Sequence, residues 1–232
     1  MCAEKFDRFN VAGGDMAEKT IVILSVGRTG SSVLRALLDQ TINDAFIQGE
    51  NFLCTWWLYR YHVAMHRQIL RPNREFDSYE DERSPFFARV RTEEVEDDLR
   101  RLTVRSITRG RAARVYGFKE IRWHECSGGN IDDVAEYFRF LSLYVSDVRL
   151  LISTRDPVEL ATSGWWHMDG TTPEEIARRQ DWLLQLCDKG LRTFVVPHAD
   201  IKVNNLGPMF EFLGEPFRPA DVARVLATRH SF

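Results

Sequence analysis

The chain has 232 residues, with 31 Lys or Arg against 34 Asp or Glu, so its formal net charge is −3. This balance argues against a strongly basic nucleic-acid-binding protein, and no nucleic-acid partner is expected. Hydrophobic residues make up 44% and charged residues 28%, which are globular values that exclude a disordered polymer. A chain of this length buries enough surface for a single domain, which we assign to residues 1–232.

The cysteines and the apolar runs bear on the cellular location of the protein. Its four cysteines are scattered and form no CxxC pair, which favours reduced thiols and a cytoplasmic location. No metal site is expected, because no set of Cys and His residues has ligand spacing. The apolar runs are shorter than the roughly 18 residues of a membrane span, so no membrane partner is expected. Residues 1–19 lack the apolar core of a signal peptide and are expected to form a loose lead-in.

The first predicted unit is a strand, a glycine-bearing loop and a helix. Residues 21–25 (IVILS) form a short β-branched run typical of a strand buried on both faces. The loop that follows contains Gly27 and Gly30. Residues 33–40 then place apolar side chains at helical spacing, which predicts the first half of a βαβ unit.

Further strands alternate with helices along the chain. One helix is predicted to begin at Asn130, and another at Thr172, where Pro173 and Glu175 complete a capping-box pattern and the helix runs to Gly190. This alternation predicts an α/β fold of three layers, with a central parallel sheet and helices on both faces. The later strands are expected at residues 115–121, 148–154 and 193–197.

Residues 55–114 interrupt this alternation and are interpreted as a helical insert. A polar, turn-like patch at residues 77–85 divides it. Open α/β sheets bind ligands at the carboxyl ends of their strands, so we expect the insert to cover that edge and shape a substrate pocket. Its aromatic residues, which include Trp56 and Trp57, suit either a hydrophobic core or a stacking surface for a ring.

The loop between the first strand and helix reads GRTGSS at residues 27–32. Backbone N–H groups and the helix dipole at such a position favour an anion, and Arg28 adds a planar positive charge. The alternative is an ordinary strand-to-helix turn that binds nothing. The loop lacks the lysine and the glycine spacing of GxxxxGK[ST], which disfavours ATP or GTP hydrolysis.

A second candidate anion site follows the strand at residues 148–154. Arg155, Asp156 and Pro157 come directly after this strand, and Ser163 lies eight residues beyond Arg155. An arginine at a strand end and a hydroxyl on the next helical stretch suit a second phosphate. The alternative is that Arg155 pairs with Asp156 at the start of a helix.

Together the two motifs resemble the sulfotransferase family that uses 3′-phosphoadenosine 5′-phosphosulfate (PAPS). RTGSS matches the loop of that family that holds the 5′-phosphosulfate, and RDPVELATS matches its 3′-phosphate motif. The resemblance implies a P-loop-like sulfotransferase architecture, in which Arg155 and Ser163 bind the 3′-phosphate. It assigns the 5′-phosphosulfate to five consecutive residues: Arg28, Thr29, Gly30, Ser31 and Ser32.

The resemblance also implies catalytic roles. Glu50 follows Gly49 beyond the first helix, where related enzymes have the general base that deprotonates the acceptor. His124 and His167 are the rival bases, and a surface carboxylate is the alternative for Glu50. Arg28 and Lys119 are expected to neutralise charge on the sulfuryl group and the leaving phosphate. Arg122 is a second candidate for this role, and for Lys119 the alternative is an ion pair with Glu120.

The expected function is transfer of a sulfuryl group from PAPS to an acceptor hydroxyl, releasing adenosine 3′,5′-bisphosphate without a metal. Arg28 replaces the lysine of the small-molecule enzymes, so the carbohydrate and tyrosylprotein branches are closest and a carbohydrate acceptor is favoured over tyrosine, a phenol or a small alcohol. Two alternatives stay open: a small-molecule kinase of P-loop type, and a non-catalytic nucleotide- or anion-binding module.

The sequence departs from the family at its last residues, ATRHSF, where the RKG-type segment that clamps the nucleotide in the cytosolic enzymes is not found. Arg229 and His230 are the candidates to replace it, and the alternative is a solvated tail. The oligomeric state does not follow from the sequence.

Overall fold

Five parallel strands form one sheet in the computed structural model, which describes residues 18–50, 53–69, 92–145 and 147–228. The strand order is β2-β3-β1-β4-β5, and every neighbouring pair is parallel. The α/β class and the parallel sheet are therefore confirmed. The strands are β1 (Lys19–Leu24), β2 (Ala45–Gln48), β3 (Val115–Glu120), β4 (Val148–Thr154) and β5 (Thr193–Pro197).

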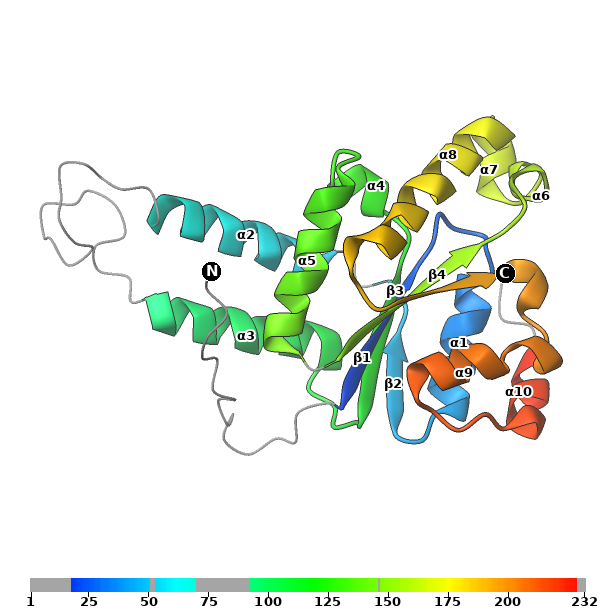
Figure 1. Cartoon of the computed structure of the whole chain (residues 1–232), viewed down its shortest axis with the longest axis horizontal. Coiled ribbons are helices and arrows are strands. Elements are labelled where there is room, and N and C mark those ends of the chain that lie inside the picture. The colour runs from blue at the N-terminus through cyan, green and yellow to red at the C-terminus, as the bar shows by residue number, and fades with distance from the viewer. Residues whose placement is uncertain (1–17, 51–52, 70–91, 146, 229–232) are drawn as a thin grey trace, which may run out of the picture.

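Helices cover both faces of the sheet, as predicted (Figure 1). Alternate residues of a strand point to opposite faces, and in β1 Ile21 and Ile23 pack in one core while Val22 and Leu24 pack in the other. The first core contains side chains of α1 (Ser31–Thr41), α9 (Gly207–Leu213) and α10 (Pro219–Leu226). The second contains side chains of α5 (Ile131–Tyr144) and α8 (Pro173–Leu184). The result is the three-layer arrangement.

The predicted helix starts are present in the structure. The Asn130 side chain caps α5 by accepting from the amide of Asp132, and Thr172 and Glu175 form a reciprocal capping box on α8. The second helix is shorter than expected, because α8 ends at Leu184 and a 3₁₀ turn continues to Gly190 in the left-handed conformation. Short elements complete the chain: α4 (Trp123–Cys126), α6 (Pro157–Ala161), α7 (Trp165–Met168), η1 (Gln185–Lys189), η2 (His198–Asp200) and η3 (Val203–Asn205).

The described part of the insert consists of α2 (Cys54–Ile69) and α3 (Thr92–Thr108). These helices contact each other and the α5 side of the molecule, and they extend away from the sheet (Figure 1). The Trp56 ring is buried 5.6 Å from the ring of Tyr137, so this aromatic residue belongs to the core, whereas Trp57 is exposed. The polar patch at residues 77–85 lies outside the described residues, and the role of the insert in acceptor binding remains a prediction.

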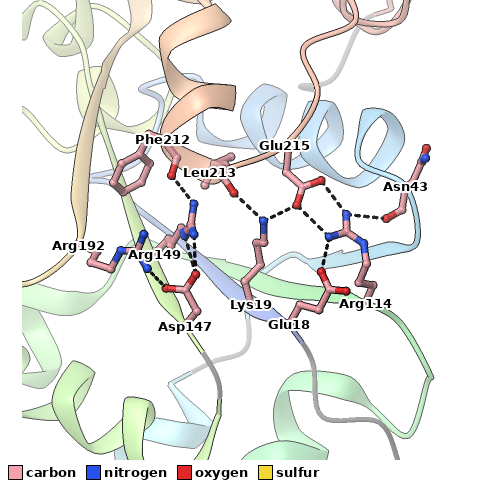
Figure 2. A network of polar contacts seen from close by, with 10 residues as sticks. All are labelled: Glu18, Lys19, Asn43, Arg114, Asp147, Arg149, Arg192, Phe212, Leu213 and Glu215. Atoms are coloured by element: carbon pink, nitrogen blue, oxygen red, sulfur yellow. Dashed lines mark hydrogen bonds and ion pairs between the residues drawn. The ribbon is translucent and has the colours of Figure 1, made fainter.

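An ion-pair network that includes the buried pair of Lys19 and Glu215 lies at the amino ends of the strands (Figure 2). Lys19 at the start of β1 donates to Glu215, which also receives two hydrogen bonds from Arg114. Arg149 of β4 pairs with Asp147 at 2.7 Å and donates to the carbonyl oxygen of Phe212. Lys19 was expected to end the loose lead-in, but this pairing allows it to be a buried strand residue. No helix in the described part of the chain is long and apolar enough to cross a membrane.

Candidate active site

The loop between β1 and α1 has a backbone that requires glycine. Gly27, Arg28 and Gly30 have φ angles of 87°, 58° and 91°, which are left-handed conformations. A Cβ atom added at Gly30 would lie 2.6 Å from Ile201 Cδ1 and 2.8 Å from His198 Cδ2. The bend at Gly30 therefore depends on the missing side chain as well as on the backbone freedom of glycine.

This loop offers hydrogen-bond donors to a ligand. Within the described residues, the backbone N–H groups of residues 28–32 donate to no acceptor, whereas the N–H of Gly27 donates to Ser25 Oγ. These groups surround the N-terminus of α1, where the helix dipole favours negative charge. The arrangement fits a phosphate or phosphosulfate group, and binding of such a group to the loop stays a prediction.

The three hydroxyl side chains of the loop are not equivalent. Ser31 is buried and its Oγ lies 3.1 Å from Ser25 Oγ. Thr29 is fully buried, and its hydroxyl has no hydrogen-bond partner in the described part of the structure. Ser32 is half-buried, and its Oγ accepts a hydrogen bond from Lys119 Nζ at 3.4 Å. In this conformation Thr29 and Ser31 present backbone groups to a ligand, while Ser32 presents its hydroxyl.

The second predicted anion motif lies against the first. Arg155 Nη1 donates to the carbonyl oxygen of Arg28 at 3.3 Å. The turn that contains Ser163 also packs on the loop, because a Cβ atom at Gly164 would lie 3.1 Å from Arg28 Nε. Ser163 itself is half-buried and donates its amide to Leu160. Parallel strands bring these two motifs to the same sheet edge although they are far apart in the sequence.

Arg155 is held at this edge by partners from three elements. Its Nε pairs with Glu159 at 3.1 Å, and its backbone exchanges two hydrogen bonds with the Gln180 side chain at 2.8 and 2.9 Å. The alternative in which Arg155 pairs with Asp156 is not found, because Asp156 caps α6 instead. Burial, and then the positive charge of Arg155, lower the pKa of His198, whose ring lies beside the loop.

The candidate base, Glu50, lies two residues after the end of β2 and contacts Lys119 near the end of β3. Its Oε1 lies 3.0 Å from Lys119 Nζ, and its Oε2 lies 3.7 Å from Arg122. The side chains of Glu50 and Lys119 are 29% and 13% exposed, so the pair is largely withdrawn from water yet reachable. The alternative pairing of Lys119 with Glu120 is not found. Glu120 instead binds Arg122 at 3.0 Å, and this hydrogen bond raises the pKa of Arg122.

The rival bases lie elsewhere. His124 is an exposed residue of α4 whose ring is 5.2 Å from the ring of Trp182. His167 is an exposed residue of α7. Neither histidine contacts Glu50 or Lys119 in the described structure, but His124 lines a hollow beside Arg122, and the choice of base remains a prediction. Arg229 and His230 lie outside the described residues.

Sequence reasoning missed three residues of the site: Glu120, Gln180 and His198. Glu120 is fully buried, and it accepts hydrogen bonds from Arg122 and from the amide of Leu53. His198 directly follows β5, so the rule that ligands bind at the carboxyl ends of parallel strands could have identified it. No sequence signal marks Gln180. Among the described residues, no group of three or more His, Cys, Asp or Glu side chains is placed to hold a metal ion.

The fold and the loop define a three-layer α/β protein with a P-loop-like strand–loop–helix at the carboxyl edge of its sheet. No protein-family model and no curated protein sequence matches the chain. Among solved structures, it is similar to the sulfotransferase domain of the Synechococcus PCC 7002 olefin synthase. The two share 13% sequence identity with a TM-score of 0.46, over 97% of this chain and 82% of that one.

Proposed function

We propose that this protein is a PAPS-dependent sulfotransferase that transfers a sulfuryl group to an acceptor hydroxyl, with a carbohydrate favoured as acceptor. The observation that carries the proposal is the contact between Arg155 Nη1 and the Arg28 carbonyl oxygen at 3.3 Å. This contact joins a loop of free amide donors to a second cationic site. A ligand with two separate anionic ends, such as PAPS, suits two adjoining sites better than a ligand with one.

The residues at the ends of β2 and β3 support an in-line displacement at sulfur. Glu50 accepts the proton of the acceptor hydroxyl as the acceptor oxygen forms a bond to sulfur. The bond between sulfur and the phosphate oxygen breaks, and its electron pair leaves with adenosine 3′,5′-bisphosphate. Lys119 contacts both Glu50 and Ser32 and is therefore placed to neutralise charge that develops between the acceptor and the loop. Arg28 serves the same purpose on the loop.

Isothermal titration with adenosine 3′,5′-bisphosphate, AMP and ATP tests the donor site. We expect the bisphosphate to bind at least about tenfold more tightly than AMP, because a hydrogen bond to a charged group contributes roughly 1.5–3 kcal/mol. Equal binding of the bisphosphate and AMP, or no binding of either, would overturn the proposal. Preference for ATP would favour the P-loop-type kinase instead.

Transfer itself is tested by incubating the protein with PAPS labelled in the sulfuryl group and a library of hydroxyl compounds. We expect labelled product to form equally well with and without EDTA, because the proposed chemistry uses side chains and backbone donors alone. Tight binding of the bisphosphate without product from any acceptor would support the non-catalytic binding module.

A further inference from the structure

A hollow with an enclosed volume of about 40 Å³ lies beside the candidate active site, between the end of β1 and the helices α4, α7 and α8. This volume has room for one small group of a ligand, such as a carboxylate, while the rest of the ligand would extend outside it. Each of these elements contributes to its lining, which includes Ser25, Arg122, His124, Trp166, Arg179 and Trp182.

The hollow is continuous with the site through two of these residues. Ser25 hydrogen bonds Ser31 of the phosphate loop, and Arg122 lies 3.7 Å from Glu50. Trp166 donates its indole N–H to the carbonyl oxygen of Gly27 at 3.5 Å, so the α7 side of the hollow also contacts the loop. A group in the hollow would therefore be separated from the candidate base by Arg122, and from the loop by Ser25.

Arg179 is the unusual residue of this wall. It is half-buried, and its guanidinium carbon lies 5.3 Å from the centre of the Trp166 ring. No carboxylate among the described residues forms an ion pair with Arg179. Its neighbour Arg178 faces elsewhere, with a 76% exposed side chain 4.0 Å from Glu175. A stacked guanidinium without an acidic partner keeps its hydrogen-bond donors available to a ligand anion.

Among the charged side chains that line the hollow, Arg179 is the one most available to attract an anion. Arg122 is already bound by the buried Glu120, at 3.0 and 3.2 Å. Glu125 also lines the hollow and opposes an anion, but it is exposed on α4, where water screens its charge. Trp182 and Val26 contribute apolar surface for the carbon frame of a ligand.

We propose that this hollow binds the acceptor and that the acceptor carries an oxyanion, a carboxylate or a sulfate, which Arg179 holds while its hydroxyl faces Glu50. This inference rests on the proposed function and narrows its substrate class to acidic hydroxyl compounds. Arg179 binds the oxyanion in a planar, two-donor geometry, and Trp166 fixes the orientation of the guanidinium.

The test compares Arg179→Gln with the matched control Arg178→Gln, which removes the adjacent charge outside the hollow. The probes are hydroxyl compounds on sugar and phenol frames in matched pairs, a carboxylate with its carboxamide and a sulfate ester with its alcohol. Tryptophan fluorescence, with adenosine 3′,5′-bisphosphate both present and absent, reports their binding, and labelled transfer reports their KM. The sulfate and carboxylate arms distinguish the two sources of the oxyanion.

We expect the unaltered protein and Arg178→Gln to bind at least one acidic probe about tenfold or more tightly than its neutral partner. Arg179→Gln should lose this preference, and Arg179→Lys should regain part of it, with melting temperatures confirming that each variant folds. Equal binding of acidic and neutral probes, absence of any acidic-probe binding, or a preference that survives in Arg179→Gln would overturn the inference.

Titration of the same variants with adenosine 3′,5′-bisphosphate separates this inference from the proposed function. We expect unchanged affinity in Arg179→Gln, because Arg155 and the loop bind the nucleotide. A tenfold loss of bisphosphate affinity in Arg179→Gln would assign the hollow to the donor and overturn the acceptor inference alone. Failure of the unaltered protein to prefer the bisphosphate over AMP would reject the proposed function independently of the probes.

Discussion

Lys119 Nζ lies 3.0 Å from Glu50 Oε1, an ion pair that joins the carboxyl ends of the neighbouring strands β3 and β2. The same ammonium group lies 3.4 Å from Ser32 Oγ on the loop between β1 and α1. One cation thus connects the candidate base to the candidate donor site. Replacing Glu50 removes the candidate base but neither this cation nor the loop, so the two roles can be tested separately.

Replacing Glu50 with Gln should remove turnover and leave nucleotide binding nearly intact. The amide has the shape of the carboxylate but cannot accept the proton, so kcat should fall by roughly 10²–10⁴. The affinity for adenosine 3′,5′-bisphosphate, measured by titration, should stay within about twofold, since Glu50 is assigned to the acceptor. Glu136→Gln, an exposed change on α5, is the control. Retained turnover in Glu50→Gln would transfer the role of base to another group, with His124 and His167 next to be replaced.

Replacing Arg155 with Ala should weaken the binding of adenosine 3′,5′-bisphosphate and leave the binding of AMP unchanged. Arg155 is assigned to the 3′-phosphate, which AMP lacks, and losing one charged hydrogen-bond donor costs roughly 1.5–3 kcal/mol, or about 10–150-fold in affinity. Titration with both nucleotides measures the difference. Arg224→Ala, on the exposed surface of α10, is the control. Unchanged affinity for the bisphosphate would show that the assignment of Arg155 is wrong.

The fold was predictable because its signals are local. The β-branched runs of β1 and β4, and the capping box at Thr172, each specify an element from a few consecutive residues. Arg28, Lys119 and Arg155 stand at or just after the ends of parallel strands, and the sheet therefore brings them to one edge.

The parts that sequence reasoning missed depend on contacts between distant residues. Gln180 holds the backbone of Arg155 from 25 positions away, and nothing in its own neighbourhood indicates this role. Lys19 is buried because it meets Glu215, 196 positions along the chain, so a charged residue assigned to a loose lead-in begins the central strand instead. The role proposed for Arg179 likewise depends on the packing of α8 beside Trp166.

Glu215→Gln should destabilise the protein, because it removes the acid from the buried pair with Lys19. Burial alone would raise the pKa of Glu215, but hydrogen bonds from Arg114 and Lys19 lower it below its ordinary value. Breaking a buried pair on one side costs about 3–5 kcal/mol, and urea denaturation should show a loss of this size. The double variant Lys19→Met/Glu215→Leu should recover part of that loss, since it leaves no buried lysine without its acid, and Arg114 loses Glu215 but keeps its ion pair with Glu18. A cost below about 1 kcal/mol for Glu215→Gln would contradict this account.

The same carboxylate should also make the free energy of unfolding depend on pH under acidic conditions. Because the pKa of Glu215 is lowered in the folded state, its contribution is complete above the ordinary value of 4.5 and is lost as the pH falls through the folded-state pKa. The free energy of unfolding should therefore decrease with acidification below about pH 4.5, and in Glu215→Gln this part of the decrease should be smaller. An unchanged pH profile in the variant would contradict the expectation.

His62 predicts a second pH effect, at milder acidity. Burial, and then the neighbouring His66, lower the pKa of His62 to about 4, and its ring packs 5.0 Å from Phe140. Between about pH 6.5 and 4 the unfolded chain binds this proton and the folded chain does not, so the free energy of unfolding falls as the pH falls. His62→Phe keeps the ring and removes the titration, so it should flatten this part of the profile, by about 1–2 kcal/mol after allowing for screening of a half-buried group. Urea denaturation from pH 7.5 to 4 measures the slope, with the exposed His167→Gln as control. Identical slopes in His62→Phe and the unaltered protein would assign the acid sensitivity to other groups.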